Sequence, residues 1–201
     1  MENLQNEYVT SLKIYAMANT INFIEGANLY LRKIQIDDIT EQFMLWFEDD
    51  ELMKYYTNSK NKITKESLLK SIQDGELAGN SFTYGIFYKE NNDCIGTIKL
   101  GPINHNHKIS DLVVLLGDKK YHGKGLAVEA IQLGNTLAFD FFDLRKLFGG
   151  MYENNISSIK AYTRAGWVIE GTLKGHYLEN GKALDRIEVG CFNPKYFPNH
   201  E

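Results

Sequence analysis

The middle of the chain joins a buried strand, a glycine-bearing loop and an amphipathic helix in direct succession, and this segment constrains the fold most. Residues 109–116 are mainly aliphatic, and the loop 117–125 carries glycines at 123 and 125. The helix that follows keeps the 3.6-residue spacing of one buried face, with apolar residues at positions 127, 130, 131, 137, 138 and 141. Glycines here allow backbone N–H groups to converge, and a helix N-terminus adds partial positive charge. The segment predicts a site for an anion such as a pyrophosphate; the alternative interpretation is an ordinary turn into a helix.

Strands and helices follow one another along the chain in an order that mixes hairpins with crossover helices. Strands are predicted over residues 28–34, 82–88, 94–100, 109–116 and 146–152, and on both sides of the Asn180-Gly181 turn. Besides the helix after the loop, helices are predicted from Asp38, where Glu41 completes a capping box, from Thr64 to about Gly75, and over 155–165. This order predicts an α+β fold built on one mixed α/β sheet, not a doubly wound sheet.

Length and composition place the chain in an ordinary class of protein. With 201 residues, 43% of them hydrophobic and 24% charged, the chain suits one domain with a real core and excludes a disordered or disulfide-stapled protein. We expect a domain over 28–193, an N-terminal extension over 1–27 and a C-terminal tail over 194–201. The net charge of −4 argues against a nucleic-acid partner.

The sequence also predicts a compartment. The longest aliphatic run, 112–116, is far shorter than the roughly 20 residues of a membrane span, and the N-terminus lacks the pattern of a secretory signal. Only two cysteines occur, Cys94 and Cys191, and each lies in a predicted strand, where we expect a reduced, buried thiol. These features predict a cytoplasmic protein without a membrane partner.

A second motif lies behind the glycine loop, over residues 152–167. Together the two motifs resemble those of the GNAT superfamily of acyl-CoA N-acyltransferases. The family's loop pattern, Gln/Arg-x-x-Gly-x-Gly/Ala, is matched by His122, Gly125 and Ala127, with a departure at its first position. Its second pattern, Asn-x-x-Ser-x-x-x-Tyr-x-x-x-Gly-Phe, is matched by Asn155, Ser158, Tyr162 and Gly166, with Trp167 in place of Phe. The resemblance covers residues 28 to 193.

The resemblance implies a mostly antiparallel twisted sheet, flanked by helices, in which two parallel strands splay apart around acyl-CoA. The strand 112–116 would pair with the pantetheine, and the loop amides would bind the pyrophosphate without a metal. The implied cofactor-binding residues are Val114, Leu115, Leu116, His122, Gly123, Lys124, Gly125, Leu126, Ala127, Asn155 and Ser158. For Asn155 the ordinary role of a helix N-cap is an additional expectation.

Two residues are candidates for the chemistry of amide formation. In the family position beside the thioester sulfur stands Tyr162, a candidate acid for the leaving thiolate; its alternative role is core packing. At the start of the central strand stands Asp111, where relatives often carry a Glu that takes the amine proton through water. An exposed rim position is the alternative for Asp111.

The acceptor amine is predicted from weaker signals. The segments 46–50, 95–103 and 149–155 resemble the branch that N-acylates nucleotide-linked amino sugars, so a dTDP- or UDP-linked amino sugar is the expected acceptor. Predicted contacts are the aromatic rings of Trp46, Tyr55 and Tyr84, with His105; cations available for a diphosphate are Lys54, Lys60, Lys62, Lys99, His105 and His107.

Three alternatives remain open at this point. The first two are polyamine acetylation, with the acceptor held by Asp49, Asp50 and Glu51, and acetylation of a ribosomal protein. The third is a module that binds acyl-CoA without catalysis, and a homodimer is possible in each case. The His105-x-His107 pair lacks a third metal ligand at suitable spacing, so we expect a plain loop there.

Overall fold

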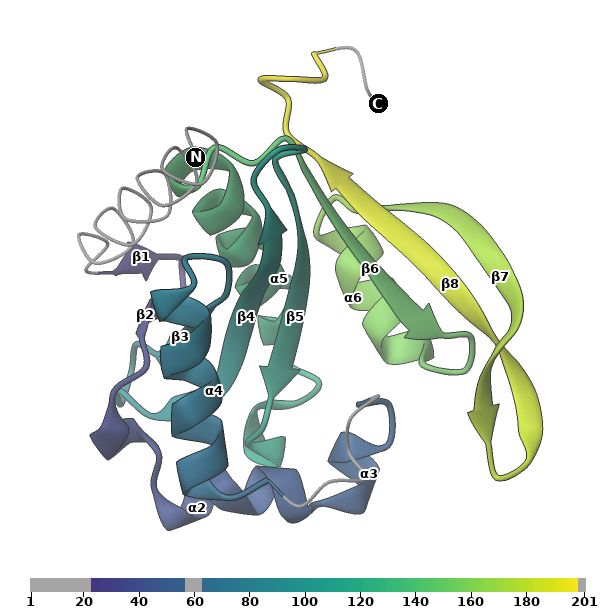
Figure 1. Ribbon diagram of the computed structural model, residues 1–201. Helices are drawn as coiled ribbons and strands as arrows, with labels where there is room; N and C mark the ends of the chain where they lie inside the picture. Colours follow the sequence, from purple (N-terminus) through teal and green to yellow (C-terminus); the bar gives the residue numbers. More distant parts are fainter. Residues whose placement is uncertain (1–22, 57–62, 199–201) are drawn as a thin grey trace, which may run out of the picture.

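One eight-stranded sheet forms the centre of the computed structural model, which describes residues 23–56 and 63–198 (Figure 1). The strands lie in the order β1-β2-β3-β4-β5-β6-β8-β7. Only β5 and β6 pair in parallel. The strands are β1 (Ile24–Glu25), β2 (Leu29–Lys33), β3 (Phe82–Tyr88), β4 (Cys94–Asn104), β5 (Ile109–Leu116), β6 (Lys146–Tyr152), β7 (Val168–Glu179) and β8 (Lys182–Phe192). The predicted mixed, mostly antiparallel sheet is confirmed.

Helices cover both faces of this sheet. In Figure 1, α4 lies in front of β3, whereas α5 lies behind the sheet, where it packs against α6. The helices are α2 (Glu41–Met44), α3 (Asp50–Met53), α4 (Lys65–Leu77), α5 (Leu126–Thr136) and α6 (Ile156–Arg164). The predicted helix to residue 141 is correct in extent, but its last turn, Leu137–Phe141, is π-helical.

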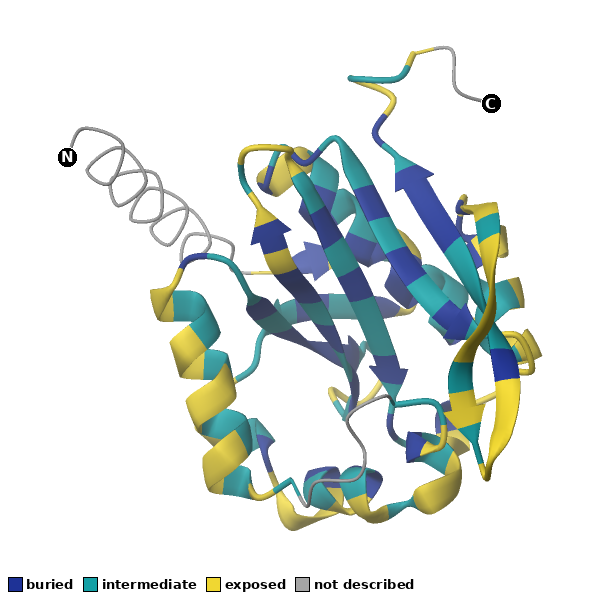
Figure 2. Ribbon diagram, turned by 45° about the vertical axis from the view of Figure 1, so that its right-hand side comes forward, coloured by how far each residue is buried: buried dark blue, intermediate teal, exposed yellow. Residues whose placement is uncertain are grey.

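Two apolar cores hold these layers together. The larger core joins the sheet to α5 and α6, and the smaller one, centred on Ile39, Phe43 and Trp46, lies under α2 and α4. Gly134 on α5 lets the helix approach the sheet closely, since a Cβ there would lie 2.9 Å from a methyl carbon of Leu112. Close packing of α5 on β5 fixes the strand that carries the predicted site. Figure 2 shows long exposed stretches in the β7–β8 hairpin, which leaves the body of the sheet.

The parallel pair separates soon after it begins. Strands β5 and β6 pair only at Ile109–Lys146, Ser110–Leu147 and Asp111–Phe148. Beyond Asp111, β5 continues to pair with β4, while β6 continues with β8. The sheet therefore opens into a V whose apex lies at Asp111, and the backbone edge of residues 112–116 faces the opening.

Several local expectations need correction. The capping box of Asp38 and Glu41 is wrong: Thr40 is the N-cap of α2 and accepts a 3.2 Å hydrogen bond from Phe43 N. The carboxylate of Asp38 instead binds the guanidinium of Arg32 at 2.6 Å, because a charged partner is within reach across the turn.

Element ends also differ from the sequence pattern. Helix α4 begins after its predicted N-cap, Thr64, but ends at Leu77, beyond Gly75. Strand β4 runs to Asn104 through a register shift after Leu100. The short strand β1, which lies within the predicted extension, pairs with β2. No helix in the described part of the chain is long and apolar enough to span a membrane.

Candidate active site

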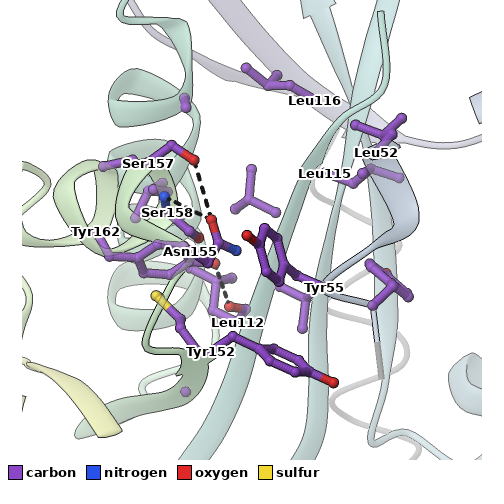
Figure 3. A pocket seen from close by; sticks show the side chains of 18 of the residues that line it. Leu52, Tyr55, Leu112, Leu115, Leu116, Tyr152, Asn155, Ser157, Ser158 and Tyr162 are labelled. Atoms are coloured by element: carbon purple, nitrogen blue, oxygen red, sulfur yellow. Dashed lines mark hydrogen bonds between the residues drawn. The ribbon is translucent and has the colours of Figure 1, made fainter. Parts of the chain in front are cut away.

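The V between β5 and β6 opens into a cleft of about 990 Å³. Its walls come from β4, β5 and β6, from the loop 117–125 and the starts of α5 and α6, and from α3 and the β7–β8 hairpin. Figure 3 shows Asn155, Ser158 and Tyr162 at this space from the α6 side, with Leu112 of β5 next to Tyr162 and with Leu115 and Leu116 of β5 across the space. The tertiary fold thus brings both predicted motifs to one cleft.

The glycine loop has the backbone that the sequence predicts. Gly123 and Gly125 adopt φ angles of 74° and 79°, and Gly125 is the N-cap of α5. These left-handed conformations favour glycine, and a Cβ at either position would meet open space. The loop residues Gly123, Gly125, Leu126 and Ala127 line the cleft, so the helix N-terminus and its free N–H groups face the space where an anion would bind.

The imidazole of His122 holds this loop onto the strand. Its Nε2 lies 2.8 Å from the carbonyl oxygen of Leu116. Since a carbonyl only accepts, Nε2 is the protonated nitrogen in this contact. His122 thus stabilises the loop through its ring and leaves anion binding to the backbone. Lys124 differs from its neighbours: its ammonium lies 5.2 Å from the ring centroid of Tyr121 and does not line the cleft.

Tyr162 lies at the apex of the V. Only 6% of its surface is exposed, and its hydroxyl donates a 2.8 Å hydrogen bond to Leu112 O (Figure 3). Burial and the nearby charge of Asp111 raise the pKa of the phenol above its ordinary range, so the group is protonated at neutral pH. Its ring packs edge-on against Trp167 with centroids 4.8 Å apart. Tyr162 therefore combines a core position with a place in the lining of the cleft, and its proton rests on Leu112 O.

Asp111 lines the same cleft, at the last position where β5 pairs with β6. A Cβ on Gly149 would lie 3.6 Å from Asp111 Oδ1, so the carboxyl rests against β6 where the strands part. Burial raises its pKa to about 6, partly offset by a backbone hydrogen bond and by the charges of Arg186 and Lys99. A carboxylate with this pKa accepts a proton near neutral pH. Asp111 is half-buried, so the alternative of an exposed rim position does not fit.

Asn155 begins α6 as its predicted N-cap. Its Oδ1 accepts hydrogen bonds from Ser158 N at 3.3 Å and from the hydroxyl of Ser157 at 3.2 Å (Figure 3). Asn155, Ser157 and Ser158 all line the cleft, which leaves the amide Nδ2 of Asn155 available to a bound molecule. A third wall consists of tyrosines: the rings of Tyr55 and Tyr152 lie 5.5 Å apart, and Tyr152 stacks on Tyr177 at 3.9 Å.

Three predicted acceptor contacts lie elsewhere. Trp46 is 5% exposed and packs on Phe43 in the smaller core, and Tyr84 is completely buried between sheet and helix. The imidazole of His105 bonds to Gly79 O at 2.9 Å and lines no part of the cleft. None of these three residues lines the cleft: the rings of Trp46 and Tyr84 pack in the two cores, as aromatic side chains commonly do, and the ring of His105 is held by a backbone carbonyl. Tyr55 does line the cleft.

Other cleft residues had no clear signal in the sequence. Tyr56, Arg186 and Tyr177 line the cleft but come from distant elements. Gly150 admits Arg186, since a Cβ there would lie 1.9 Å from Arg186 Nε. Of the cations expected for a diphosphate, Lys54 and Lys99 line the cleft, whereas Lys60 and Lys62 lie outside the described residues. Burial raises the pKa of Cys94 to about 12 and of Cys191 to about 11, so neither is an activated thiol.

Residues 28–168, which include this cleft's loop, strand and α6, match the family model described as Acetyltransferase (GNAT) domain. The chain belongs to the GNAT acetyltransferase family. The probable N-acetyltransferase YjcK of Bacillus subtilis is 24% identical over 176 residues, which cover 85% of this GNAT chain and 97% of that protein. Family membership makes the protein an N-acetyltransferase.

Two further comparisons concern spermidine enzymes. Spermidine N(1)-acetyltransferase of Escherichia coli is 29% identical over 106 residues, so the match spans 53% of this chain and 56% of that enzyme. The crystal structure of spermidine N-acetyltransferase from Vibrio cholerae in complex with CoA and spermine has a TM-score of 0.76 at 19% identity, covering 86% of this GNAT chain and 99% of that chain. At this sequence identity, the structural likeness shows a shared fold.

Proposed function

We propose that this GNAT protein transfers an acetyl group from acetyl-CoA to a small primary amine bound in the cleft beside Asp111. One observation carries the proposal: a carboxyl with a pKa of about 6 and a neutral phenol, Tyr162, lie together where the parallel strands part. Amide formation from a thioester needs a proton acceptor for the amine and a proton donor for the leaving sulfur. The two residues supply both.

The cleft fits acetyl-CoA in shape and chemistry. The pyrophosphate would bind the backbone N–H groups of loop 117–125 at the N-terminus of α5, where Gly123 and Gly125 keep space open. The unpaired edge of residues 112–116 would bind the pantetheine as a strand binds its neighbour, and Asn155 Nδ2 would add a donor from α6. Acetyl-CoA supplies the acyl group as an activated thioester.

Asp111 then acts as the general base. Its carboxylate receives a proton from the amine, directly or through one water, as the nitrogen bonds to the carbonyl carbon. Arg186 and Lys99 favour the charged form of Asp111, whereas burial disfavours it. This balance keeps the carboxylate available at neutral pH while it remains basic enough to accept the proton.

Tyr162 acts on the leaving group. As the carbon–sulfur bond breaks, the phenol donates its proton to the sulfur, which yields the free thiol of CoA and the acetamide of the amine. The carbonyl of Leu112, which accepts the hydrogen bond from Tyr162 in the resting protein, orients the hydroxyl. No residue of the chain becomes covalently modified in this direct transfer.

The comparisons support a small amine over a nucleotide-linked amino sugar. Two of the rings that were expected to stack on a base, Trp46 and Tyr84, are buried in the cores, and relatives of this chain act on spermidine according to their names. Asp49 and Glu51, expected to hold a polyamine, both bind Lys119 at the edge of the cleft. The reacting end of the acceptor is therefore proposed to be an unhindered aliphatic amine.

A direct assay tests the function. Purified protein is incubated with acetyl-CoA and a panel of aliphatic amines, and release of CoA thiol is measured together with the mass of the acetylated product. We expect amine-dependent thiol release that Asp111→Asn and Tyr162→Phe each reduce. Tight binding of acetyl-CoA without transfer to any amine would instead favour the non-catalytic binding module and would reject the proposal.

A further inference from the structure

In the described part of the cleft wall, Lys99 and Asp111 are charged side chains that form no ion pair within 4 Å, although the charge of Lys99 acts on Asp111 from a distance. The other cations of this wall each have a carboxylate within 4 Å, in the pairs Lys54–Glu179, Lys119–Asp49 and Arg186–Glu188. Within residues 23–56 and 63–198, the structure shows no hydrogen bond or ion pair of the Lys99 ammonium and no ion pair of the Asp111 carboxylate. Among the described wall residues, Lys99 and Asp111 are thus the two charged side chains left without an ion pair, while Lys119 is shared by Asp49 and Glu51.

The two charges lie side by side on the sheet. Lys99 on β4 pairs with Val113 on β5, and Asp111 lies two residues before Val113 on the same face. Such diagonal neighbours have Cβ atoms roughly 7–8 Å apart. Both residues line the cleft, and Lys99 is half-buried between the fully buried Ile98 and Leu100. A small molecule at Asp111 therefore has the Lys99 ammonium within reach of its other end.

We propose that the acceptor is an amino carboxylate, whose amine faces Asp111 while its carboxylate binds the ammonium of Lys99. This inference rests on the proposed transfer to a primary amine in the same cleft. A zwitterion matches the two unpaired charges, one for one. A carboxylate carries the single negative charge that one lysine neutralises, whereas a phosphate monoester carries close to two at pH 7, and one of these would stay unmatched.

A polyamine fits the same wall less well. Its distal ammonium groups would approach the ammonium of Lys99, and the guanidinium of Arg186 also lines the cleft. The carboxylate of Glu188 already binds the guanidinium of Arg186 at 2.6 Å, so it is not free to bind an ammonium group of the polyamine. Like charges placed together in a partly buried site select against a ligand even where its reacting end fits. Lys99 is therefore a specificity-determining residue that favours an anionic tail over a cationic one.

Three amines with the same four-carbon chain isolate the charge of the tail. Acetylation of 4-aminobutanoate, 1-aminobutane and 1,4-diaminobutane is measured at saturating acetyl-CoA, and kcat/KM is compared. The expected order is aminobutanoate first, with at least a tenfold advantage over aminobutane, and diaminobutane last. Preference for diaminobutane, or equal use of all three amines, would overturn the inference while leaving acetyl transfer intact.

Variants then assign the preference to Lys99. Because the charge of Lys99 also acts on Asp111, Lys99→Met should lower kcat/KM for every amine. We expect the value for aminobutanoate to fall at least tenfold further than the value for aminobutane, and Lys99→Arg should restore most of the preference. Lys182→Met, at an exposed position of β8, is the matched control and should change none of the three.

A different result would count against Lys99 as the carboxylate site. If Lys99 serves only as a counter-ion of Asp111, Lys99→Met lowers all three values by the same factor, and this overturns the inference. No transfer to any amine by wild-type protein that binds acetyl-CoA would reject the proposed function, and the inference with it.

Discussion

The hydroxyl of Tyr162 donates a 2.8 Å hydrogen bond to the carbonyl oxygen of Leu112. Leu112 is the first residue of β5 after the last pairing with β6, Asp111 to Phe148. The phenol therefore satisfies a buried backbone acceptor at the point where the strand ladder ends. One contact thus joins α6 to β5 and places a proton donor at the apex of the cleft, next to the base.

Removing this proton while keeping the ring tests Tyr162. We expect Tyr162→Phe to lower kcat by roughly 10²–10⁴-fold, because the thiolate loses its proton donor, while KM for acetyl-CoA stays within a small factor. Steady-state kinetics with acetyl-CoA and an accepted amine measure both. A rate close to wild type would assign Tyr162 to packing and to the Leu112 carbonyl alone.

Tyr84→Phe is the matched control, and it carries a stability prediction of its own. The Tyr84 hydroxyl is buried and has no hydrogen-bond partner among the described residues, whereas the Tyr162 hydroxyl has one. Leaving a buried polar group unpaired costs about 1–3 kcal/mol, so its removal should raise the free energy of unfolding by about that amount without changing kcat. Urea denaturation measures the effect; clear destabilisation would show that the hydroxyl has a partner.

The proton acceptor is tested by the pH–rate profile. Because burial raises the pKa of Asp111 to about 6, kcat/KM of the wild type should rise with pH through an inflection near 6 as the carboxylate forms. Asp111→Asn should remove this inflection, with the largest deficit near neutral pH and a smaller one at high pH, where the amine is already neutral. A deficit of the same size at every pH would assign Asp111 an orienting role.

The same carboxyl predicts a pH-dependent stability. Its pKa rises from 3.8 to about 6 on folding, so the native state holds the proton more tightly than the unfolded chain. Stability contributed by this group is therefore present below about pH 4 and is lost as the pH rises to 6. At pH 7–8, Asp111→Asn removes a charged group that burial disfavours and should therefore raise the free energy of unfolding. The increase is at most about 3 kcal/mol, because each pKa unit corresponds to about 1.36 kcal/mol. Chemical denaturation at pH 4 and pH 8 compares the two proteins.

The glycine loop is tested with a matched pair of substitutions. Gly125 and Gly181 both adopt a φ of 79°, and both have open space where a Cβ would lie. Alanine strains either backbone by about 1–2 kcal/mol, but only Gly125 lines the cleft. We expect Gly125→Ala to weaken acetyl-CoA binding at least fivefold in calorimetric titration. Gly181→Ala, in the β7–β8 turn, should leave it unchanged. Equal effects of the two would remove the loop from the cofactor site.

Local patterns determined a large part of this protein. The spacing of apolar residues predicted the strand 109–116 and the helix after it. Two glycines predicted the loop, and Asn155 was recognisable as an N-cap. Each of these features depends on neighbours within a few residues. The glycine loop and the motif around Tyr162 together sufficed to place the chain with GNAT enzymes. Such signals are short-range and survive in a single sequence.

Tertiary structure alone decided which side chains share the cleft. Trp46 and Tyr84 have the same aromatic character as Tyr55, yet burial separates them, because a ring enters the core or faces the cleft according to which elements cover it. Lys99 and Arg186 lie far apart in the chain and both line the cleft. Among the described residues, Lys99 is left without an ion pair only once the other cations of the cleft have found their carboxylates. Charge pairing and burial are sums over the whole fold, so no local pattern contains them.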